Sequence, residues 1–473
     1  MAYVGYVTKL NNFRPHPNAD KLQLADAFGN TVCVPLDYTP DTLGVYFPCD
    51  GQLSVEFCEK NNLVRKKDDA GNNIGGYMDP DKRNVTAIRL RGEKSDGLFM
   101  PIACLNYCYI DFNAGLYLKV GDTIDVVNGH DICQKYIPRK PNYAQPEGGN
   151  RTRKKKVPVA PLFAEHADTE QLAYNLSAFK PGDQIEITLK MHGTSQRTGY
   201  LPTLQGYACA IPWARWVYRH INPETKNRFA KKLLDAAMKY VNPVYDWGYV
   251  SGTRRVVLND YEGGFYGSNE FREQHSKTFE GKLLKGETVY YEICAFTTNG
   301  TPIMSSGKVP KEAQNQYGET MIFSYGCSPT GKNEMPQSVL YVYRMTLTTE
   351  EGYIVEYTPD YMRYRCEQMG VKCVPVFYKG YIPEYQILPD DVGSPSAIDA
   401  GEWVKNIAEQ YYDGPDPIGK THVREGVVVR IVNRPKFCAY KHKNFLFKQI
   451  SCIISDKIAN GNEVISEDVL SEM

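Results

Sequence analysis

The sequence lacks the features that define several common protein classes. No apolar run is long enough to span a membrane, and the N-terminus has no apolar signal core. The 13 cysteines are odd in number and include no Cys-x-x-Cys pair, so we expect mostly free thiols in a reducing compartment. The sequence also contains no internal repeat. These absences predict a soluble protein of the cytoplasm.

The chain has no excess of charge of either sign. Lys plus Arg and Asp plus Glu both number 55, so the net charge does not indicate a partner, and any nucleic-acid surface must be a local basic patch. The 473 residues are enough for two or three domains, and 42% hydrophobic with 23% charged residues is an ordinary globular balance. The 35 tyrosines could stack on bases or simply pack in the core.

The first 130 residues predict short strands separated by Gly, Pro and Asp, which favours a small barrel or sandwich. His16–Leu22 is similar to the entry of tRNA-binding OB-fold domains. We therefore expect residues 1–130 to be an OB-like domain that binds nucleic acid. Its basic residues could form a face for a nucleic-acid backbone or a solvated strand edge. The expected strands are Ala2–Leu10, Thr31–Val34, Gly44–Phe47, Ile88–Arg91, Leu116–Val120 and Thr123–Val127.

Residues 131–160 predict a linker, because prolines and glycines interrupt them. The basic run Arg151–Lys156 could be a phosphate-contacting arm or a solvated tether. A second domain is expected over residues 161–455, followed by a polar tail at 456–473. Within it we expect a helix capped by Asp168 or Thr169 and another beginning at Asn222-Pro223, together with strands at Met321–Tyr325 and Ser338–Leu347.

The most informative segment is Gln184–Leu189, in which apolar and polar residues alternate. This period of two predicts a half-buried strand. The strand leads into Lys190, followed by His192 and Gly193. A lysine at the end of a strand suits a nucleophile that faces a phosphate, and glycine lets the backbone approach a ligand closely. Taken alone, a surface lysine before a turn is the more common interpretation.

Four further elements follow Lys190 in a fixed order, and each has a strand setting. A carboxylate in a strand or a Lys-x-Lys pair is usually a solvated surface feature when it stands alone. The order of the whole set is what indicates a catalytic site. The four elements are the pair Arg254-Arg255, Glu292, Glu425-Gly426, and Lys441 with Lys443.

This set resembles the covalent nucleotidyltransferases, the superfamily of polynucleotide ligases and capping enzymes. Lys190–Gly193 resembles motif I, Glu292 motif III, and Glu425-Gly426 motif IV. Phe323–Tyr325 and Lys441–Lys443 resemble motifs IIIa and V. The resemblance covers most of the chain, although residues 200–250 and 350–415 match no family pattern.

The variant of motif I is similar to ATP-dependent RNA ligases, and so is the segment Glu165–Glu170 upstream of it. The Deinococcus-type RNA ligases, which carry an N-terminal OB domain, are the most similar family. The resemblance implies an α+β chain, in which an OB-like β-barrel precedes a nucleotidyltransferase domain built on antiparallel sheets with flanking helices. It implies ATP and Mg²⁺ or Mn²⁺ as cofactors, and RNA with a nick or broken ends as the partner of a monomer.

The resemblance also implies a role for each site residue. Lys190 would attack the α-phosphorus of ATP as a neutral amine, and nearby cations favour that neutral form. Glu425 would hold the metal. Other residues would bind the nucleotide: Lys441 and Lys443 its α-phosphate, Glu292 its ribose, and Phe323 or Tyr325 its adenine. Glu165, His192, Gly193 and Arg255 are further nucleotide-binding candidates. Glu287 is the alternative to Glu292, and His192 could instead satisfy a local hydrogen bond.

Overall fold

The computed structural model has two regions, an N-terminal region (residues 3–136) and a C-terminal region (residues 159–458). Predictions for Arg151–Lys156, Asp168, Arg255 and the tail beyond residue 458 lie outside the described residues. Among the described residues, no helix combines the length and the apolar character needed to cross a membrane. The described residues are 3–67, 73–76, 78–136, 159–167, 169–222, 225, 227–254, 256–258, 269–306, 308–331, 335–386 and 396–458.

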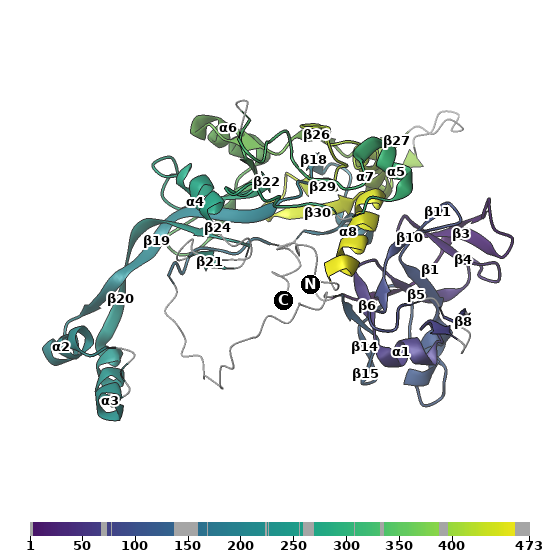
Figure 1. The fold of residues 1–473 in the computed structure, drawn as a ribbon, viewed down its shortest axis with the longest axis horizontal. Helices are drawn as coiled ribbons and strands as arrows, with labels where there is room; N and C mark the ends of the chain where they lie inside the picture. The colour runs from purple at the N-terminus through teal and green to yellow at the C-terminus, as the bar shows by residue number, and fades with distance from the viewer. Residues whose placement is uncertain are drawn as a thin grey trace.

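The N-terminal region is built from short, mostly antiparallel strands (Figure 1). A four-stranded sheet has the order β12 (Leu98–Pro101), β5 (Leu43–Phe47), β1 (Gly5–Lys9), β13 (Thr123–Ile124). Two three-stranded sheets lie beside it. One has the order β2 (Asn11–Pro15), β3 (Leu22–Ala27), β4 (Asn30–Pro35). The other has the order β16 (Cys133–Lys135), β6 (Gly51–Leu53), β9 (Asn84–Val85). The hairpins are β10 (Ala87–Leu90) with β11 (Glu93–Asp96), β14 (Val126–Val127) with β15 (His130–Asp131), and β7 (Lys66–Lys67) with β8 (Asn73–Gly75), and α1 is Val55–Lys60.

Strand β5 lies at the centre of this region because both of its faces are buried. Val45 and Phe47 pack into one apolar cluster, whereas Tyr46 packs into another on the opposite face. The expected β-rich composition is confirmed, but the paired strands do not close into a barrel within the described residues. Strand β16 pairs with β6, so the region extends past residue 130.

The C-terminal region contains two sheets that face each other across an apolar core (Figure 1). Helix α7 (Ala400–Glu409) covers the outer face of the smaller sheet. The smaller sheet has the order β17 (Glu170–Gln171), β30 (Cys438–Lys443), β29 (Gly426–Ile431), β18 (Gln184–Leu189), β26 (Val376–Tyr381). The larger sheet has the order β21 (Val257–Leu258), β20 (Val241–Gly252), β19 (Thr194–Cys209), β22 (Glu287–Ala295), β23 (Ser338–Thr348), β24 (Ile354–Glu356), with β25 (Lys372–Cys373) also on β23.

Strand β18 has the predicted bounds, but neither of its faces is solvated. Ile185 and Ile187 pack under α7, and the opposite face carries Glu186 and Thr188. Glu186 is itself buried, because this polar face lines a pocket between the two sheets. The alternating pattern therefore separates a core face from a pocket face.

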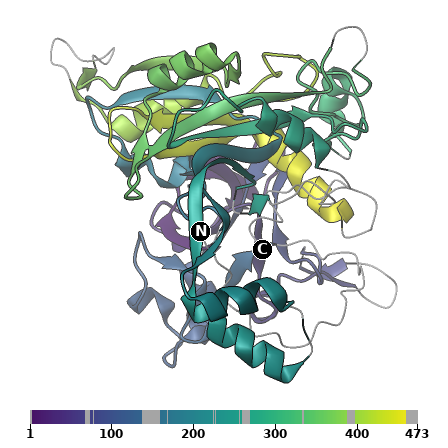
Figure 2. The ribbon, with the colours of Figure 1, turned by 90° about the vertical axis from the view of Figure 1, so that its left-hand side faces the viewer.

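A long two-stranded ribbon leaves the larger sheet and carries two helices at its end (Figures 1 and 2). Beyond Gly199, β19 pairs only with β20 among the described strands. We call Tyr200–Cys209, Val241–Tyr249 and the helices between them the arm. Its tip consists of α2 (Pro212–His220), α3 (Arg228–Ala237) and the 3-10 helix η5 (Met238–Tyr240).

Four secondary-structure predictions are wrong. Glu170–Gln171 is not helical, because it pairs in parallel with β30 as β17, and a 3-10 helix, Leu172–Tyr174, follows. Helix α3 begins at Arg228 rather than at Asn222, because the Asn227 side chain caps it by accepting from the backbone N–H groups of Phe229 and Ala230. The segment Met321–Tyr325 packs into the core and is not a β-strand. Leu116 likewise ends a 3-10 helix, Ala114–Leu116, and the pair expected at 116–127 does not form.

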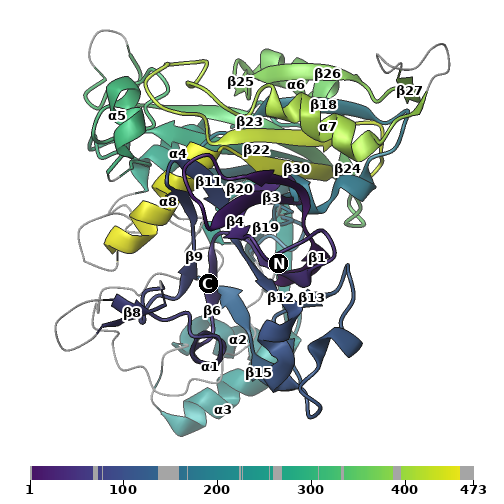
Figure 3. The same ribbon diagram turned by 90° about the vertical axis from the view of Figure 1, so that its right-hand side faces the viewer.

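Helix α8 (Phe445–Ile458) joins the two regions (Figure 3). Its Lys448 lies in an ion pair with Asp96 of β11, and the Phe445 ring lies 5.2 Å from the Lys94 ammonium. Stacking of Tyr174 on Tyr6, with ring centroids 4.6 Å apart, adds a second contact. The remaining helices are α4 (Glu270–Lys277), α5 (Lys311–Tyr317) and α6 (Pro359–Met369), and a hairpin pairs β27 (Tyr385–Gln386) with β28 (Ser396–Ala397).

The ion pair between Lys448 and Asp96 predicts a measurable loss of stability. Replacing Lys448 by Met leaves the buried Asp96 carboxylate without its cation, which costs about 3 kcal/mol of unfolding free energy. Urea denaturation at neutral pH measures this loss. Lys436→Met, at an exposed site, is the control and should change stability by less than about 0.5 kcal/mol. Equal stability of the two variants would contradict the prediction.

Candidate nucleotide-binding site

Lys190 lies directly after β18, where the strand has just left the sheet. Its backbone N–H donates to the carbonyl of Gly426, 3.0 Å away. Its side-chain Nζ lies 2.8 Å from Oε1 of Glu425, so the two candidate residues meet although 234 positions separate them in the chain. The structure thus brings together the predicted nucleophile and the predicted metal ligand.

Glu425 is buried and surrounded by cationic or titratable groups. Lys443 Nζ lies 3.6 Å from Oε1, and His192 Nδ1 lies 3.5 Å from Oε2. Burial alone would raise the pKa of the Glu425 carboxyl, but the proximity of Lys190, His192 and Lys443 lowers it well below its usual value. Glu425 is therefore a carboxylate at neutral pH.

The second carboxylate oxygen of Glu425 suits a divalent cation. Oε2 is buried and accepts no hydrogen bond from any described residue. The described residues contain no cluster of three or more His, Cys, Asp or Glu side chains that could hold a metal by themselves. Mg²⁺ commonly binds through one or two carboxylates and completes its coordination with water and substrate phosphates. A single carboxylate oxygen without a hydrogen bond, beside Lys190 and Lys443, fits that pattern.

Two glycines of the motifs are required by close backbone contacts. A Cβ on Gly193 would lie 2.3 Å from the carbonyl oxygen of Ile293, so this glycine lets the loop approach β22. Its N–H donates to Oε1 of Glu292 at 3.1 Å. Gly426 has a φ of +146°, and a Cβ there would lie 2.0 Å from the carbonyl oxygen of His442. Both glycines thus fix strand contacts around the site.

The choice between Glu292 and Glu287 is resolved by their positions on β22. Glu292 lines the pocket that contains Lys190. Glu287 is fully buried elsewhere and accepts hydrogen bonds from Arg365 at 2.8 Å. The Glu292 carboxylate is therefore the one available to a ligand in the pocket.

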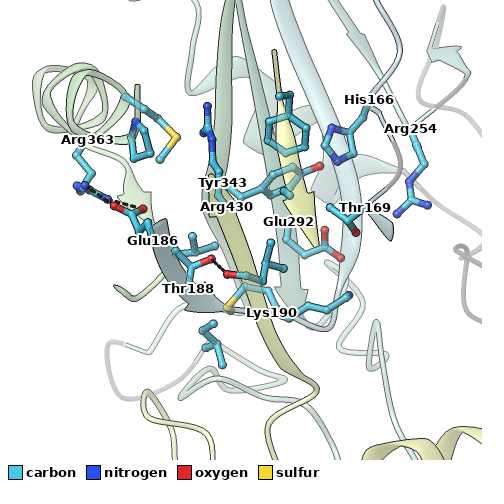
Figure 4. Close-up of a pocket in the computed structure, with 18 residues that line it drawn as sticks. His166, Thr169, Glu186, Thr188, Lys190, Arg254, Glu292, Tyr343, Arg363 and Arg430 are labelled. Atoms are coloured by element: carbon cyan, nitrogen blue, oxygen red, sulfur yellow. Dashed lines mark hydrogen bonds and ion pairs between the residues drawn. The ribbon is translucent and has the colours of Figure 1, made fainter. Parts of the chain in front are cut away.

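The pocket lies between the two sheets and has a volume of about 850 Å³, including the part open to solvent (Figure 4). Its apolar lining includes residues such as Met362, Val428 and Phe437. In Figure 4 the Glu186–Arg363 ion pair lies on the opposite side from Arg254. A pocket that combines apolar and polar lining groups suits a nucleoside.

Tyr343 of β23 is an aromatic residue that lines this pocket, as are Phe437 and His166. Its hydroxyl lies 2.9 Å from the Ser195 hydroxyl, which fixes the ring beside the pocket. Phe323 and Tyr325, the predicted adenine-stacking pair, are buried and do not line it. Tyr325 instead accepts a hydrogen bond from the backbone N–H of His192 at 2.7 Å, so it helps to hold the loop that follows Lys190. Tyr343 therefore replaces them as the candidate stacking ring.

The other predicted residues lie around the pocket in different ways. Glu165 is exposed, next to His166, which does line the pocket. Arg255 is outside the described residues, but its neighbour Arg254 lines the pocket. Lys441 and Lys443 project from the same face of β30 and line a second cavity between the two regions. Thr169 lines both cavities, so the lysine pair adjoins the pocket.

The sequence did not identify the ion pair of Glu186 and Arg363 as part of the pocket. Glu186 accepts two hydrogen bonds from Arg363, at 2.9 and 2.8 Å, and its side chain is buried. Glu186 lies four residues before Lys190 on the same face of its strand, which is the signal that could have identified it. Arg363 comes from α6, in a segment without any motif, and no sequence signal points to it.

Comparison with known proteins gives a match at the level of structure only. No protein-family model and no curated protein sequence matches the chain. Among solved structures, a variant of the Naegleria gruberi RNA ligase with ATP and Mn has a TM-score of 0.51 and 13% identity, and the match covers 94% of this chain and 98% of that one. Another variant of that ligase without ligand has a TM-score of 0.50 and 15% identity, with 95% and 97% covered.

The chain has the fold of these RNA ligases. The match covers nearly all of both chains, so it includes the N-terminal region as well as the two sheets around Lys190. At 13% and 15% sequence identity the match shows the fold alone, so the substrate and the role of each residue depend on the site itself.

Proposed function

We propose that the chain is an ATP-dependent RNA ligase that forms a lysyl-AMP intermediate on Lys190, transfers the AMP to an RNA 5′-phosphate, and joins that end to a 3′-hydroxyl. The observation that carries this proposal is that Lys190 lines the pocket while its side-chain nitrogen lies against the buried Glu425 carboxylate, which Lys443 also approaches. A site built only for binding has no need of an amine held beside a buried carboxylate at that position.

The three steps conserve one high-energy bond from ATP. In the first, the Lys190 amine forms a bond to the α-phosphorus, the bond to pyrophosphate breaks, and the nitrogen loses a proton. In the second, an oxygen of the RNA 5′-phosphate displaces Lys190 and takes the AMP. In the third, the RNA 3′-hydroxyl loses its proton, attacks that 5′-phosphate and releases AMP.

The residues around Lys190 have distinct parts in the first step. Lys190 contacts the Glu425 carboxylate, and its amine must be neutral and free of that contact when it attacks the α-phosphorus. Glu425 would hold a divalent cation, Mg²⁺ or Mn²⁺, which supplies positive charge beside the α-phosphate when bound. Lys441 and Lys443 would neutralise the charge that develops on the phosphate oxygens. Glu292 would accept from a ribose hydroxyl.

We further propose that the N-terminal region is an OB-like domain that binds the RNA. Its position supports this role, since α8 starts two residues after Lys443 and packs on β10 and β11. Arg89 and Lys94 of those strands both lie against the Phe445 ring. RNA bound by this domain would therefore lie close to the lysine pair. A monomer contains every group that this proposal uses.

Replacing Tyr343 by Leu is expected to weaken ATP binding. Loss of the stacking ring should raise the ATP concentration for half-maximal adenylation about tenfold, because base–aromatic stacking contributes about 1–3 kcal/mol. Tyr343→Phe keeps the ring and should stay near wild type. Phe323→Leu should lower thermal stability and leave the ATP dependence unchanged, because that ring is in the core. An ATP dependence altered by Phe323→Leu and not by Tyr343→Leu would contradict this assignment.

A sealing assay tests the proposed function as a whole. The protein is incubated with Mg²⁺, a nicked RNA duplex and ATP, and ligation is followed by denaturing electrophoresis. Parallel reactions replace ATP by GTP, or RNA by DNA of the same sequence. Sealing of RNA with ATP supports the proposal, whereas preference for GTP or for DNA identifies a capping enzyme or a DNA ligase of the same chemistry. Absence of both sealing and a protein–AMP adduct would identify an inactive relative that only binds nucleic acid.

A further inference from the structure

The arm is the largest feature of the fold that the proposed chemistry does not use. Its ribbon residues Tyr200–Cys209 extend roughly 30 Å at about 3.3 Å per residue, which is close to one turn of a double helix. It begins in the same strand as Thr194, four residues after Lys190. The arm and the N-terminal region project to the same side of the two sheets (Figures 1 and 2).

The tip folds around a small core of its own. Ala214, Val217, Leu234 and Ala237 pack between α2 and α3, and this cluster contains no residue outside the arm. An isolated two-stranded ribbon is marginally stable in water and contributes little to the core it leaves. The tip therefore adds little to the stability of the sheets around Lys190. Its outward surface is the part that remains to be explained.

That surface is basic and aromatic. Asp235 is the only acidic residue of the tip within the described part of the chain. Four large aromatic side chains are exposed there, led by Phe229 at 77% and Trp216 at 59%. The exposed basic residues are Arg215, Arg219, Arg228, Lys231, Lys232 and Lys239.

The basic residues of α3 lie at positions where they destabilise the helix. Arg228, Lys231 and Lys232 recur at positions i, i+3 and i+4, so like charges gather on one face of the helix. They also lie in its first half, where the helix dipole favours acidic residues, and the first turn contains none. An arrangement that opposes helix stability suits a polyanion that neutralises it.

We propose that the tip of the arm binds the RNA substrate, with its basic face on the phosphate backbone and its exposed aromatic rings against unpaired bases. This inference rests on the proposed function. Charge complementarity favours RNA over a protein partner, because Lys and Arg combined with exposed aromatic rings match phosphates and base faces. The arm and the N-terminal region would then hold the RNA at two places on the same side of Lys190.

The first test removes the tip. Cys209 pairs directly with Val241, so residues 210–240 can be replaced by a two-residue Asn-Gly turn that closes the ribbon as a hairpin. The RNA is a nicked duplex with a single-stranded extension, long enough to reach both Lys190 and the tip, and its binding is measured by fluorescence anisotropy. We expect at least about a tenfold loss of affinity. Formation of the protein–AMP adduct without RNA reports whether the sheets around Lys190 remain folded.

The second test changes charge without removing structure. Arg228→Gln, Lys231→Gln and Lys232→Gln are combined, and the matched control combines Lys308→Gln, Lys372→Gln and Lys379→Gln at exposed sites outside the arm. We expect the tip variant, and not the control, to reduce the slope of log affinity against log salt by about 2. RNA affinity and salt slope that remain at wild-type values in both tip variants would overturn the proposal. RNA binding that depends on the tip in a protein that forms no AMP adduct would sustain it and refute the ligase function alone.

Discussion

The variant Lys190→Met is expected to form no protein–AMP adduct and to seal no RNA with ATP. Methionine is unbranched and one atom shorter than lysine but has no amine to attack phosphorus, so adenylation should fall by at least about 10³-fold. Glu425 keeps Lys443 as a cationic neighbour in this variant, so we expect the protein to fold. Labelled ATP and denaturing electrophoresis measure the adduct.

A pre-adenylated RNA end separates the role of Lys190 from general damage to the site. An RNA that already carries AMP on its 5′-phosphate bypasses the step that needs the amine. Lys190→Met should therefore seal a pre-adenylated nick within about tenfold of the wild-type rate. Failure on this substrate as well, in a folded protein, would contradict the assignment of Lys190 as the nucleophile.

The variant Glu425→Gln is expected to have the second largest effect. The amide keeps the shape of the side chain but removes the charge that holds Lys190 and Lys443 and would bind the metal. Adenylation should fall by about 10²–10³-fold, the loss typical of one electrostatic group that acts on a transition state. Rates measured across a series of Mg²⁺ and Mn²⁺ concentrations would show a weaker dependence on the metal.

Glu287→Gln is the matched control for that experiment. Glu287 is also buried and paired with a cation, but its partner is Arg365 and it lies outside the pocket. The control should lower the free energy of unfolding by about 3 kcal/mol and leave adenylation close to wild type below the unfolding temperature. Equal losses of adenylation in the two variants would show that Glu425 acts through stability alone.

The sequence correctly predicted the site residues that lie on strands or are glycines. Period-two alternation identified Gln184–Leu189 with its correct bounds, and Lys190 follows it as expected. The strand settings of Glu292 and of Lys443 were correct too. These residues lie in neighbouring strands whose pairing forces them together, so local pattern was enough to locate them.

The remaining site residues could not be predicted, because distant segments supply them. Tyr343 lies one strand beyond Glu292. From the local sequence, Phe323 and Tyr325 were equally good candidates for the ring that stacks on adenine. Arg363 comes from a helix without any motif. The polar face of β18 was read as solvent-facing, since alternation cannot tell a pocket from solvent. Only the packing of the two sheets distinguishes these cases.

The arm escaped prediction for a related reason. Residues 200–250 match no family pattern, and the helix expected from Asn222-Pro223 does not indicate what it packs on. Phe229 is exposed, and within the described part of the chain the apolar cluster of α3 contains only residues of the arm. A two-stranded ribbon that leaves its sheet cannot be distinguished in sequence from strands that stay within it.

The account depends most directly on the covalent chemistry of Lys190. The test is to incubate the protein with ATP and Mg²⁺ in the absence of RNA, digest it, and locate any AMP by peptide mass spectrometry. The account predicts one modified peptide, with AMP joined to the Lys190 nitrogen and removed again by added pyrophosphate. An unmodified protein, or AMP found on another residue while Lys190 remains free, would contradict it.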